Sequence, residues 1–403
     1  MYISFGGIAF FVVLANLYVC LEAYLFFRSL NRLIAGKTGR KILLRFYWPL
    51  ALLIAGLCFY FRYSSGGLRS LFGLASSYWG LFLFIPFFIL SELLILGRFI
   101  FRTAGRKRPP ASGPAAPVSG GTAFGLWVRA GAIVLAAGIL VLGSLSARYA
   151  KVTNYTVSIE KPLPRNGLRV ILISDIHIGS MVHKKELKRI VSGINALKGD
   201  IVLIAGDIID RNLDVYKREN LNEELSAINA PLGVYAVPGN HDYFGGDLNG
   251  LKQCLADGGV KMLVDESVLV NDSFYVIGRN DFSVGRRGTG RKTLIELTAG
   301  IDASLPVIVM DHQPLNLGEA EAAGMDIQVS GHTHHGQIWP GPLITRRIYE
   351  DDYGLLYRGK TAIVVTSGCG TWGPPLRIGT RSEIVCIDLR GTGDTVSPDY
   401  PVD

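Results

Sequence analysis

Four long apolar runs lie in the first third of the 403-residue chain. They carry no charged residue and cover Met1–Leu21, Phe46–Phe61, Ser70–Ser91 and Ala130–Ala147. A helix of about 20 apolar residues is long enough to cross the hydrocarbon core of a bilayer. We therefore expect a four-helix transmembrane region over residues 1–150, with spans near 3–27, 46–61, 70–91 and 130–147. Residues 106–124 are rich in Pro, Ala, Gly and Ser, which predicts a flexible linker before the fourth span.

Residues 151–403 show a different pattern, in which short apolar runs alternate with polar and amphipathic segments. The strand-like runs are Leu168–Ser174, Ile201–Ala205, Val234–Val237, Phe274–Ile277, Val307–Met310, Ile327–Val329, Ala362–Thr366 and Ile384–Leu389. Between the first two runs, Lys184–Leu197 places its apolar residues at a helical period. Such alternation is typical of an α/β domain in which helices cover the sheets, and we assign it to 151–403.

The charge of the chain is divided between these two regions. Residues 1–150 carry a net charge of +13 and residues 151–403 a net charge of −5, which together give +8. A nucleic-acid-binding surface is not expected, because the globular region is acidic. The three connections between the predicted spans hold six, two and six Lys or Arg residues. Because positive charge stays on the cytoplasmic side, we expect the termini and the α/β domain outside the cytoplasm.

Clusters of Asp, Asn and His follow successive strand-like runs. They are Asp175-Ile-His177, Gly206-Asp207-Ile-Ile-Asp210-Arg211, Gly239-Asn240-His241-Asp242, Asp311-His312-Gln-Pro314 and Gly331-His332-Thr-His334-His335-Gly336-Gln337. Ligand sites in open α/β sheets lie beyond the carboxyl ends of the strands, so these loops can converge on one rim. Carboxylate, amide and imidazole groups together suit divalent transition metals. The five cysteines have no metal-ligand spacing, and a disulfide framework is not expected.

The order D-x-H, G-D-x-x-D, G-N-H-D and G-H-T-H resembles the calcineurin-like metallophosphoesterase superfamily, over residues 165–390. With its apolar N-terminal region, the chain is similar to the bacterial membrane-associated branch with phosphodiesterases of the YaeI and YkuE kind. The resemblance implies a two-sheet αββα sandwich and two divalent metal ions. It assigns seven residues as metal ligands: Asp175, His177, Asp207, Asn240, His312, His332 and His334. Asp207 would bridge the two ions.

The resemblance also assigns roles beside the metals. His241 matches the histidine that meets the leaving group, and Asp210 matches the acid that orients this histidine. Arg211 falls where some relatives bind phosphate; the alternative is a solvated loop arginine. His335 stands where the branch usually has Gly, and either approaches the metal or substrate or, as we favour, faces solvent.

A glycine-rich segment, Ser367–Arg377, also resembles this branch. Trp372 and Arg377 could contact the organic part and the phosphate of a substrate, respectively. The alternative is a rigid turn with a packed tryptophan. Cys369 lies in the same segment with no base beside it in sequence, so a thiol nucleophile is not expected.

These assignments predict a metal-dependent phosphoric ester hydrolase, most simply a phosphodiesterase or pyrophosphatase. Two divalent ions can clamp phosphate oxygens and lower the pKa of a bridging water, which then attacks phosphorus as hydroxide. The mixed nitrogen and oxygen ligands leave Mn, Fe, Zn and Ni open.

The predicted anchor indicates a class of substrate. A tethered enzyme would act on a lipid-linked phosphate ester, and some relatives of the branch hydrolyse UDP-2,3-diacylglucosamine. That lipid is made in the cytoplasm, which conflicts with the topology expected from the charge distribution. The competing hypothesis is a membrane sensor or scaffold that binds metal without turnover.

Overall fold

We analysed a computed structural model that describes residues 131, 134–135, 138–163, 167–179, 182–244, 246–285 and 290–392. The first three predicted spans and the linker lie outside these residues, and the fourth is described only in part. Among the described residues, no helix combines the length and the apolar character needed to cross a bilayer. The chain divides into two units, Met1–Val141 and Leu142–Asp403, and the described strands all belong to the second.

The second unit begins with the helical residues 142–148 and then alternates strands and helices. In its first half the order is β1 (Lys151–Ser158), β2 (Leu168–Ile173), α5 (Lys184–Ala196), β3 (Ile201–Ile204), α6 (Asp214–Arg218), α7 (Asn222–Ser226), β4 (Val234–Ala236), α8 (Leu248–Asp257) and β5 (Val260–Met262). The second half holds β6 (Glu266–Val270), β7 (Phe274–Gly278), α9 (Phe282–Gly285), α10 (Leu294–Thr298), β8 (Val307–Met310), α11 (Gly318–Ala322), β9 (Ile327–Ser330), η3 (His334–Gly336), α12 (Gly341–Ile348), β10 (Gly354–Arg358), β11 (Thr361–Val365) and β12 (Glu383–Arg390).

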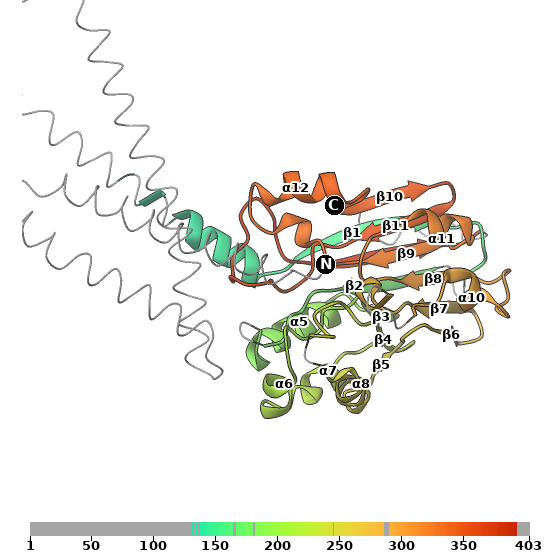
Figure 1. Ribbon diagram of the computed structural model, residues 1–403, viewed down its shortest axis with the longest axis horizontal. Helices are drawn as coiled ribbons and strands as arrows, with labels where there is room; N and C mark the ends of the chain where they lie inside the picture. The colour runs from blue at the N-terminus through green and yellow to red at the C-terminus, as the bar shows by residue number, and fades with distance from the viewer. Residues whose placement is uncertain are drawn as a thin grey trace, which may run out of the picture. The chain divides into compact units, whose positions relative to one another are not determined.

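The strands form two mixed six-stranded sheets (Figure 1). Sheet 1 has the order β1-β12-β2-β3-β4-β5, and sheet 2 the order β10-β11-β9-β8-β7-β6. Strands β2 to β5 are parallel to one another, as are β7, β8, β9 and β11. The loops that leave the carboxyl ends of the parallel strands within each sheet therefore emerge at one edge of that sheet.

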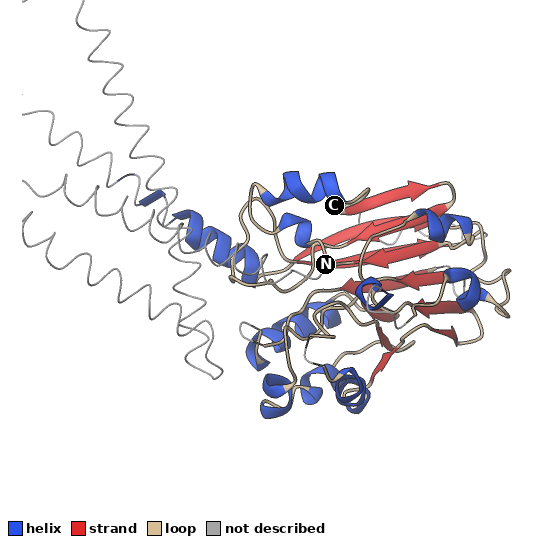
Figure 2. Cartoon of the chain, in the orientation of Figure 1, coloured by secondary structure: helices blue, strands red, loops and turns tan. Residues whose placement is uncertain are grey.

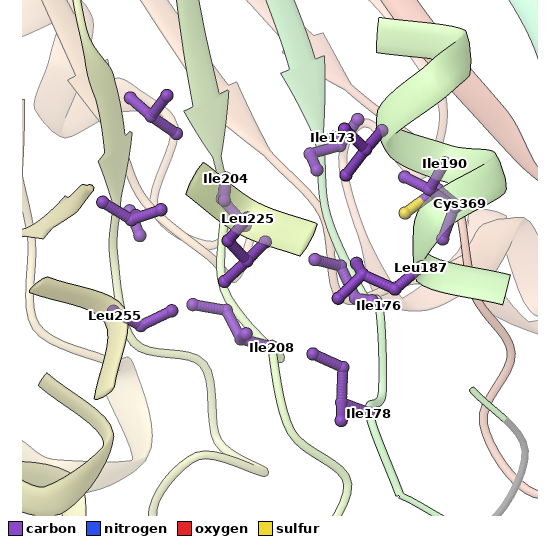
Figure 3. Close-up of a cluster of buried hydrophobic side chains, with 14 of the residues drawn as sticks. Ile173, Ile176, Ile178, Leu187, Ile190, Ile204, Ile208, Leu225, Leu255 and Cys369 are labelled. Atoms are coloured by element: carbon purple, nitrogen blue, oxygen red, sulfur yellow. The ribbon is translucent and has the colours of Figure 1, made fainter. Parts of the chain in front are cut away.

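Side chains on the outer face of sheet 1 pack against helices. Successive residues of a strand point to opposite faces, so Ile171 and Ile173 of β2 face this side. They meet Leu187 and Ile190 of α5, while α7 and α8 contribute Leu225 and Leu255 (Figure 3). The amphipathic pattern that predicted a helix at 184–197 reflects this packing.

The alternate residues of the same strands fill the space between the two sheets. Val170 and Leu172 of β2 belong to one buried cluster with Val276 of β7 and Val329 of β9. On the far side of sheet 2, Leu297 of α10 joins a further cluster with residues of β7 and β8. The second unit is thus a four-layer αββα sandwich, as predicted (Figure 2).

Candidate metal centre

The predicted ligands follow the carboxyl ends of five strands. Segments after β2, β3 and β4 carry Asp175, His177, Asp207 and Asn240, and segments after β8 and β9 carry His312, His332 and His334. The structure places one ligand atom from each of three residues within 4.8 Å of the others in two groups, Asp175/His177/His334 and Asp207/His312/His332. Residues far apart in sequence therefore converge at one edge of the sandwich.

The first group is almost fully buried. Oδ1 of Asp175 lies 3.4 Å from Nε2 of His334 and 4.0 Å from Nε2 of His177. The two Nε2 atoms lie 3.1 Å apart. A carboxylate oxygen and two imidazole nitrogens thus point at one small volume, which is the geometry of a cation site.

The second group is centred on Asp207. Its Oδ2 lies 3.3 Å from Nε2 of His312, and that nitrogen lies 3.2 Å from Nδ1 of His332. Nδ1 of His312 lies 2.7 Å from the carbonyl oxygen of Ala205, which fixes the ring and directs Nε2 at the cluster. The same Oδ2 of Asp207 lies 3.8 Å from Nε2 of His177. Asp207 therefore stands between both groups.

Asn240, which the resemblance assigns to the second ion, lies in the loop after β4. Its Oδ1 atom is buried and has no hydrogen-bond partner among the residues that the structure describes. A buried acceptor without a partner costs free energy, about 1–3 kcal/mol. A bound cation would satisfy this oxygen, so the residues present fit a metal.

The backbone at the ligands has an unusual conformation. Asp175, His177, Asp207, His332 and His334 have φ values of 54°, 53°, 52°, 71° and 48°. Positive φ is uncommon outside glycine, and such strain gathers at functional sites. The positive φ bends the backbone sharply where each of these residues follows the end of a strand.

Close packing around Asp207 requires a glycine in the neighbouring loop. A Cβ atom on Gly239 would lie 2.1 Å from Oδ1 of Asp207, a distance that atoms do not tolerate. The glycine of the G-N-H-D motif is therefore explained by the approach of two loops.

Burial keeps several of the imidazoles neutral. It lowers the pKa of His334 to about 3 and that of His332 to about 4, and it also lowers the pKa of His177. For Asp207, burial favours the neutral form, but the charge and hydrogen bond of His312 outweigh it and lower the pKa. Neutral imidazoles and an ionised carboxylate are the forms that bind metal.

His241 lies beside the cluster, and its pKa is raised, as is that of His312. Burial lowers the pKa of His241, but the hydrogen bond and charge of Asp210 reverse the effect and raise it. Nδ1 of His241 lies 2.9 Å from the carbonyl oxygen of Asp210 and 3.4 Å from its Oδ1. The Asp210 carbonyl and carboxylate thus orient the ring and favour the protonated form. His241 also lies within reach of His177 and Asp207 in a third three-residue group.

The three predicted substrate contacts occupy different positions. Arg211 and Trp372 are exposed, and the Trp372 ring lies 6.5 Å from that of His241. Arg377 is only 1% exposed, and its contact with phosphate stays a prediction. Its guanidinium donates hydrogen bonds to carbonyl oxygens of His334, at 3.1 Å, and of Ser367, at 2.6 Å. Arg377 thereby holds the His334 loop against the glycine-rich segment.

His335 contacts two neighbouring residues of the domain. It is half-buried, with Nδ1 3.2 Å from Oδ2 of Asp352 and its ring packed on Tyr353 at 4.4 Å. Asp352 and Tyr353 thus hold the His335 side chain.

Sequence reasoning assigned no role to Asp242, although the residue belongs to the G-N-H-D motif. Its carboxylate is buried and accepts hydrogen bonds from the backbone N–H groups of Ile208, Ile209 and Gly239. Burial raises the pKa of Asp242 to about 7. Asp242 ties the loop after β4 to the loop after β3, and its position after a ligand and His241 is the signal that points to it.

Comparison with known proteins agrees with this geometry. Residues 168–336 match the family model of calcineurin-like phosphoesterases. The chain is 30% identical over 405 residues to a Danio rerio protein named transmembrane protein with metallophosphoesterase domain, covering 95% of this chain and 89% of that protein. It is 32% identical over 256 residues to a metallophosphoesterase of Aquifex aeolicus, covering 62% of this chain and 95% of that protein.

A third relative supports the same assignment. The metallophosphoesterase YkuE of Bacillus subtilis is 29% identical over 287 residues, covering 64% of this chain and 94% of YkuE. The chain belongs to the calcineurin-like phosphoesterase family. Membership implies hydrolysis of phosphoric esters with divalent metal ions.

Proposed function

We propose that the protein is a membrane-anchored phosphodiesterase or pyrophosphatase that uses two divalent metal ions. The observation that carries this proposal is the position of Asp207 between two groups of ligand atoms. One carboxylate within reach of both groups is the arrangement that a pair of bridged ions requires. Asp175, His177 and His334 would hold one ion with Asp207, and Asn240, His312 and His332 would hold the other with it.

The donor set leaves the identity of the metal open among Mn, Fe, Zn and Ni. When bound, the two ions would neutralise the charge of the phosphate oxygens and supply a nucleophile from water at neutral pH. His241, protonated and held by Asp210, would donate its proton to the leaving oxygen. Arg211 and Trp372, both exposed, would contact the phosphate and the organic part of the substrate.

The buried thiol of Cys369 supports a mechanism without a covalent enzyme intermediate. Burial raises the pKa of Cys369 to about 12, so the thiolate is not populated at neutral pH. The nucleophile is therefore water in this proposal.

The membrane anchor is supported by the four apolar runs in residues 1–150. It is also supported by the Danio rerio relative, whose name describes a transmembrane protein and whose match covers 95% of this chain. We place the catalytic domain outside the cytoplasm because of the Lys and Arg distribution. Ser226, which is exposed, offers a test as Ser226→Cys in a cysteine-free background. A membrane-impermeant maleimide should label this variant in intact cells, and labelling only after lysis would reverse the topology.

We propose a lipid-linked phosphodiester or pyrophosphate as the substrate class, since the anchor holds the cluster near lipids. UDP-2,3-diacylglucosamine is a candidate only with the reversed topology, because it is made in the cytoplasm. The labelling experiment therefore also decides between these two groups of substrates.

Hydrolysis by the purified chain tests the activity itself. Bis-p-nitrophenyl phosphate and p-nitrophenyl phosphate would be assayed with Mn, Fe, Zn and Ni salts and with a chelator. We expect metal-dependent turnover that favours the diester. Stoichiometric metal binding with no turnover of either ester would instead support the sensor or scaffold hypothesis.

A further inference from the structure

Helix α12 presents large apolar side chains to solvent. Leu343, Ile344 and Ile348 are 54%, 58% and 61% exposed, and Trp339 just before the helix is 64% exposed. The opposite side of α12 is fixed to the domain, because the hydroxyl of Thr345 donates a hydrogen bond of 2.6 Å to Asp352. We call Trp339, Leu343, Ile344 and Ile348 the α12 face.

The α12 face is attached rigidly to the loop that carries His334. Gly336, two residues after His334, packs directly against Gly341 at the start of α12. A Cβ atom on Gly336 would lie 2.2 Å from the carbonyl carbon of Gly341, and one on Gly341 would lie 2.0 Å from the carbonyl oxygen of Gly336. If α12 lies at the surface of a partner, the loop that carries His334 therefore lies close to the same surface.

Two more exposed aromatic residues lie beside His241. The Phe244 ring is 55% exposed and lies 4.7 Å from that of His241, and Trp372 is 56% exposed. The side chain of Gln337 joins Trp372 to the α12 segment, since it donates to the Trp372 carbonyl at 2.8 Å and accepts from its N–H at 2.9 Å. Exposed aromatic side chains thus lie beside His241, and Trp372 is joined to the α12 segment.

The composition of α12 indicates which kind of partner the α12 face contacts. Residues 339–348 (WPGPLITRRI) contain no acid, and both Arg346 and Arg347 are exposed. A helix facing water would present polar residues there. An apolar face with tryptophan at its edge and arginines along it is typical of helices that lie in the interface of an anionic bilayer. Charge and polarity therefore favour a lipid surface over a protein partner.

The start of the domain lies on the same side as the α12 face. Residues 142–148 are helical, and the carbonyl oxygens of Gly143 and Ser146 accept hydrogen bonds from the N–H groups of Arg377 and Ser382, at 3.0 and 3.1 Å. The N–H of Trp339 donates to Ile378 in this same loop, at 2.8 Å. The predicted fourth span ends at residue 147, so a single loop contacts both the α12 face and the end of that span.

We propose that the α12 face, with Phe244 and Trp372, inserts into the bilayer interface and holds the metal cluster at the level of lipid headgroups. The substrate is then an amphiphilic phosphoric ester whose apolar part stays in the bilayer while its phosphate reaches His241. Interfacial helices bury their apolar face about 5–10 Å into the boundary between headgroups and acyl chains, which brings the rest of the domain to the headgroup layer. The statement about substrate rests on the proposed function, whereas the statement about the surface does not.

Photocrosslinking tests the surface without any need for turnover. The full chain would carry p-benzoylphenylalanine at Ile344, in vesicles of phosphatidylcholine and phosphatidylglycerol that contain an alkyne-tagged phospholipid. Ile295 of α10 is the control position, because it is 76% exposed and lies at the opposite end of the sheets from α12 (Figure 1). We expect a lipid adduct at 344 at least about fivefold above that at 295. Equal adducts at both positions, or an adduct at 344 to a second copy of the chain, would overturn the proposal.

Kinetics on two esters with one leaving group test the consequence for substrate. Leu343→Ser/Ile344→Ser/Ile348→Ser changes only exposed side chains, and Ile295→Ser is the matched control. For dioleoylglycero-phospho-p-nitrophenol in vesicles, we expect kcat/KM of the triple variant to fall at least about fivefold. Turnover of soluble bis-p-nitrophenyl phosphate should stay within about twofold, and the control should change neither reaction. An equal loss on both esters, or no loss on the vesicle ester, contradicts the role of the surface. A wild-type chain that hydrolyses neither ester contradicts the proposed function, and the crosslinking result still stands.

Discussion

The two sheets of the sandwich contribute different chemistry to the same cluster. The loops of sheet 1 supply both carboxylates of the ligand groups, Asp175 and Asp207, together with His177. The loops of sheet 2 supply only imidazoles to those groups, from His312, His332 and His334. Both of these groups draw on both sheets, whereas the third group, with His241, comes from sheet 1 alone.

This division couples metal binding to the packing of the sandwich. The ligand atoms come together only where Val170 and Leu172 of sheet 1 pack against Val276 and Val329 of sheet 2. A ligand that binds only the folded state stabilises it by mass action. Metal should therefore stabilise the closed sandwich, and the contributions of the two sheets can be separated by substitution.

Asp207→Asn should give the largest effect, since this side chain serves both groups. Each ion is expected to stabilise the transition state by several kcal/mol, and each 1.36 kcal/mol changes the rate tenfold. We therefore expect kcat for bis-p-nitrophenyl phosphate to fall by at least about 10⁴. Metal content measured by mass spectrometry should fall as well. Normal turnover in this variant would refute a two-metal site.

His241→Ala tests a sheet 1 residue that we place beside the metals. We expect the rate to fall about 10²–10⁴-fold while metal content stays constant. The loss should be smaller for nitrophenyl esters than for alkyl esters, because nitrophenolate needs no proton to leave. If metal is lost together with activity, His241 is a ligand, as its place in the third group also allows.

His334→Ala tests the contribution of sheet 2 to stability. Metal at 100 times its Kd should stabilise the wild-type domain by about 2.7 kcal/mol, which raises Tm by about 5–10 °C. The variant should lose most of this rise. His183→Ala is the control, since His183 pairs with Glu219 at 2.7 Å, away from the ligand groups. The measurement is thermal unfolding with and without a chelator. If metal raises the Tm of His334→Ala as much as that of the wild type, His334 is not a ligand.

Arg211→Ala should give the smallest effect. Arg211 is exposed, and a contact to phosphate in solvent contributes about 1 kcal/mol or less. We expect KM to rise by about two- to fivefold with little change in kcat. An unchanged KM would show that Arg211 is a solvated loop residue.

The sequence predicted best the parts of the fold with a continuous buried pattern. The run Val307–Met310 coincides with β8, and the predicted helix at 184–197 matches α5 to within one residue. The edge strands β1 and β10 were missed, because their partly exposed side chains weaken the apolar signal. Pairing with a neighbouring strand, which the sequence pattern does not show, holds them in the sheets.

The motifs predicted which residues the structure brings together in the two ligand groups, but not the residues that support them. Arg377 carries a charge, which predicts exposure, yet five backbone carbonyl and imidazole contacts compensate its burial. Those acceptors become available only through the three-dimensional path of the glycine-rich segment. The same holds for Asp242, whose backbone partners come from another loop.

The position of β12 has a consequence for synthesis of the chain. Strand β12, at residues 383–390, pairs with β1 on one side and β2 on the other, although β1 and β2 are made first. Sheet 1 therefore cannot form completely until β12 has left the ribosome. A chain cut at residue 336, where the family match ends, would leave β1 without its partner. Such long-range pairing slows folding and leaves strand edges open meanwhile. In cells, the domain should depend on chaperones until translation ends.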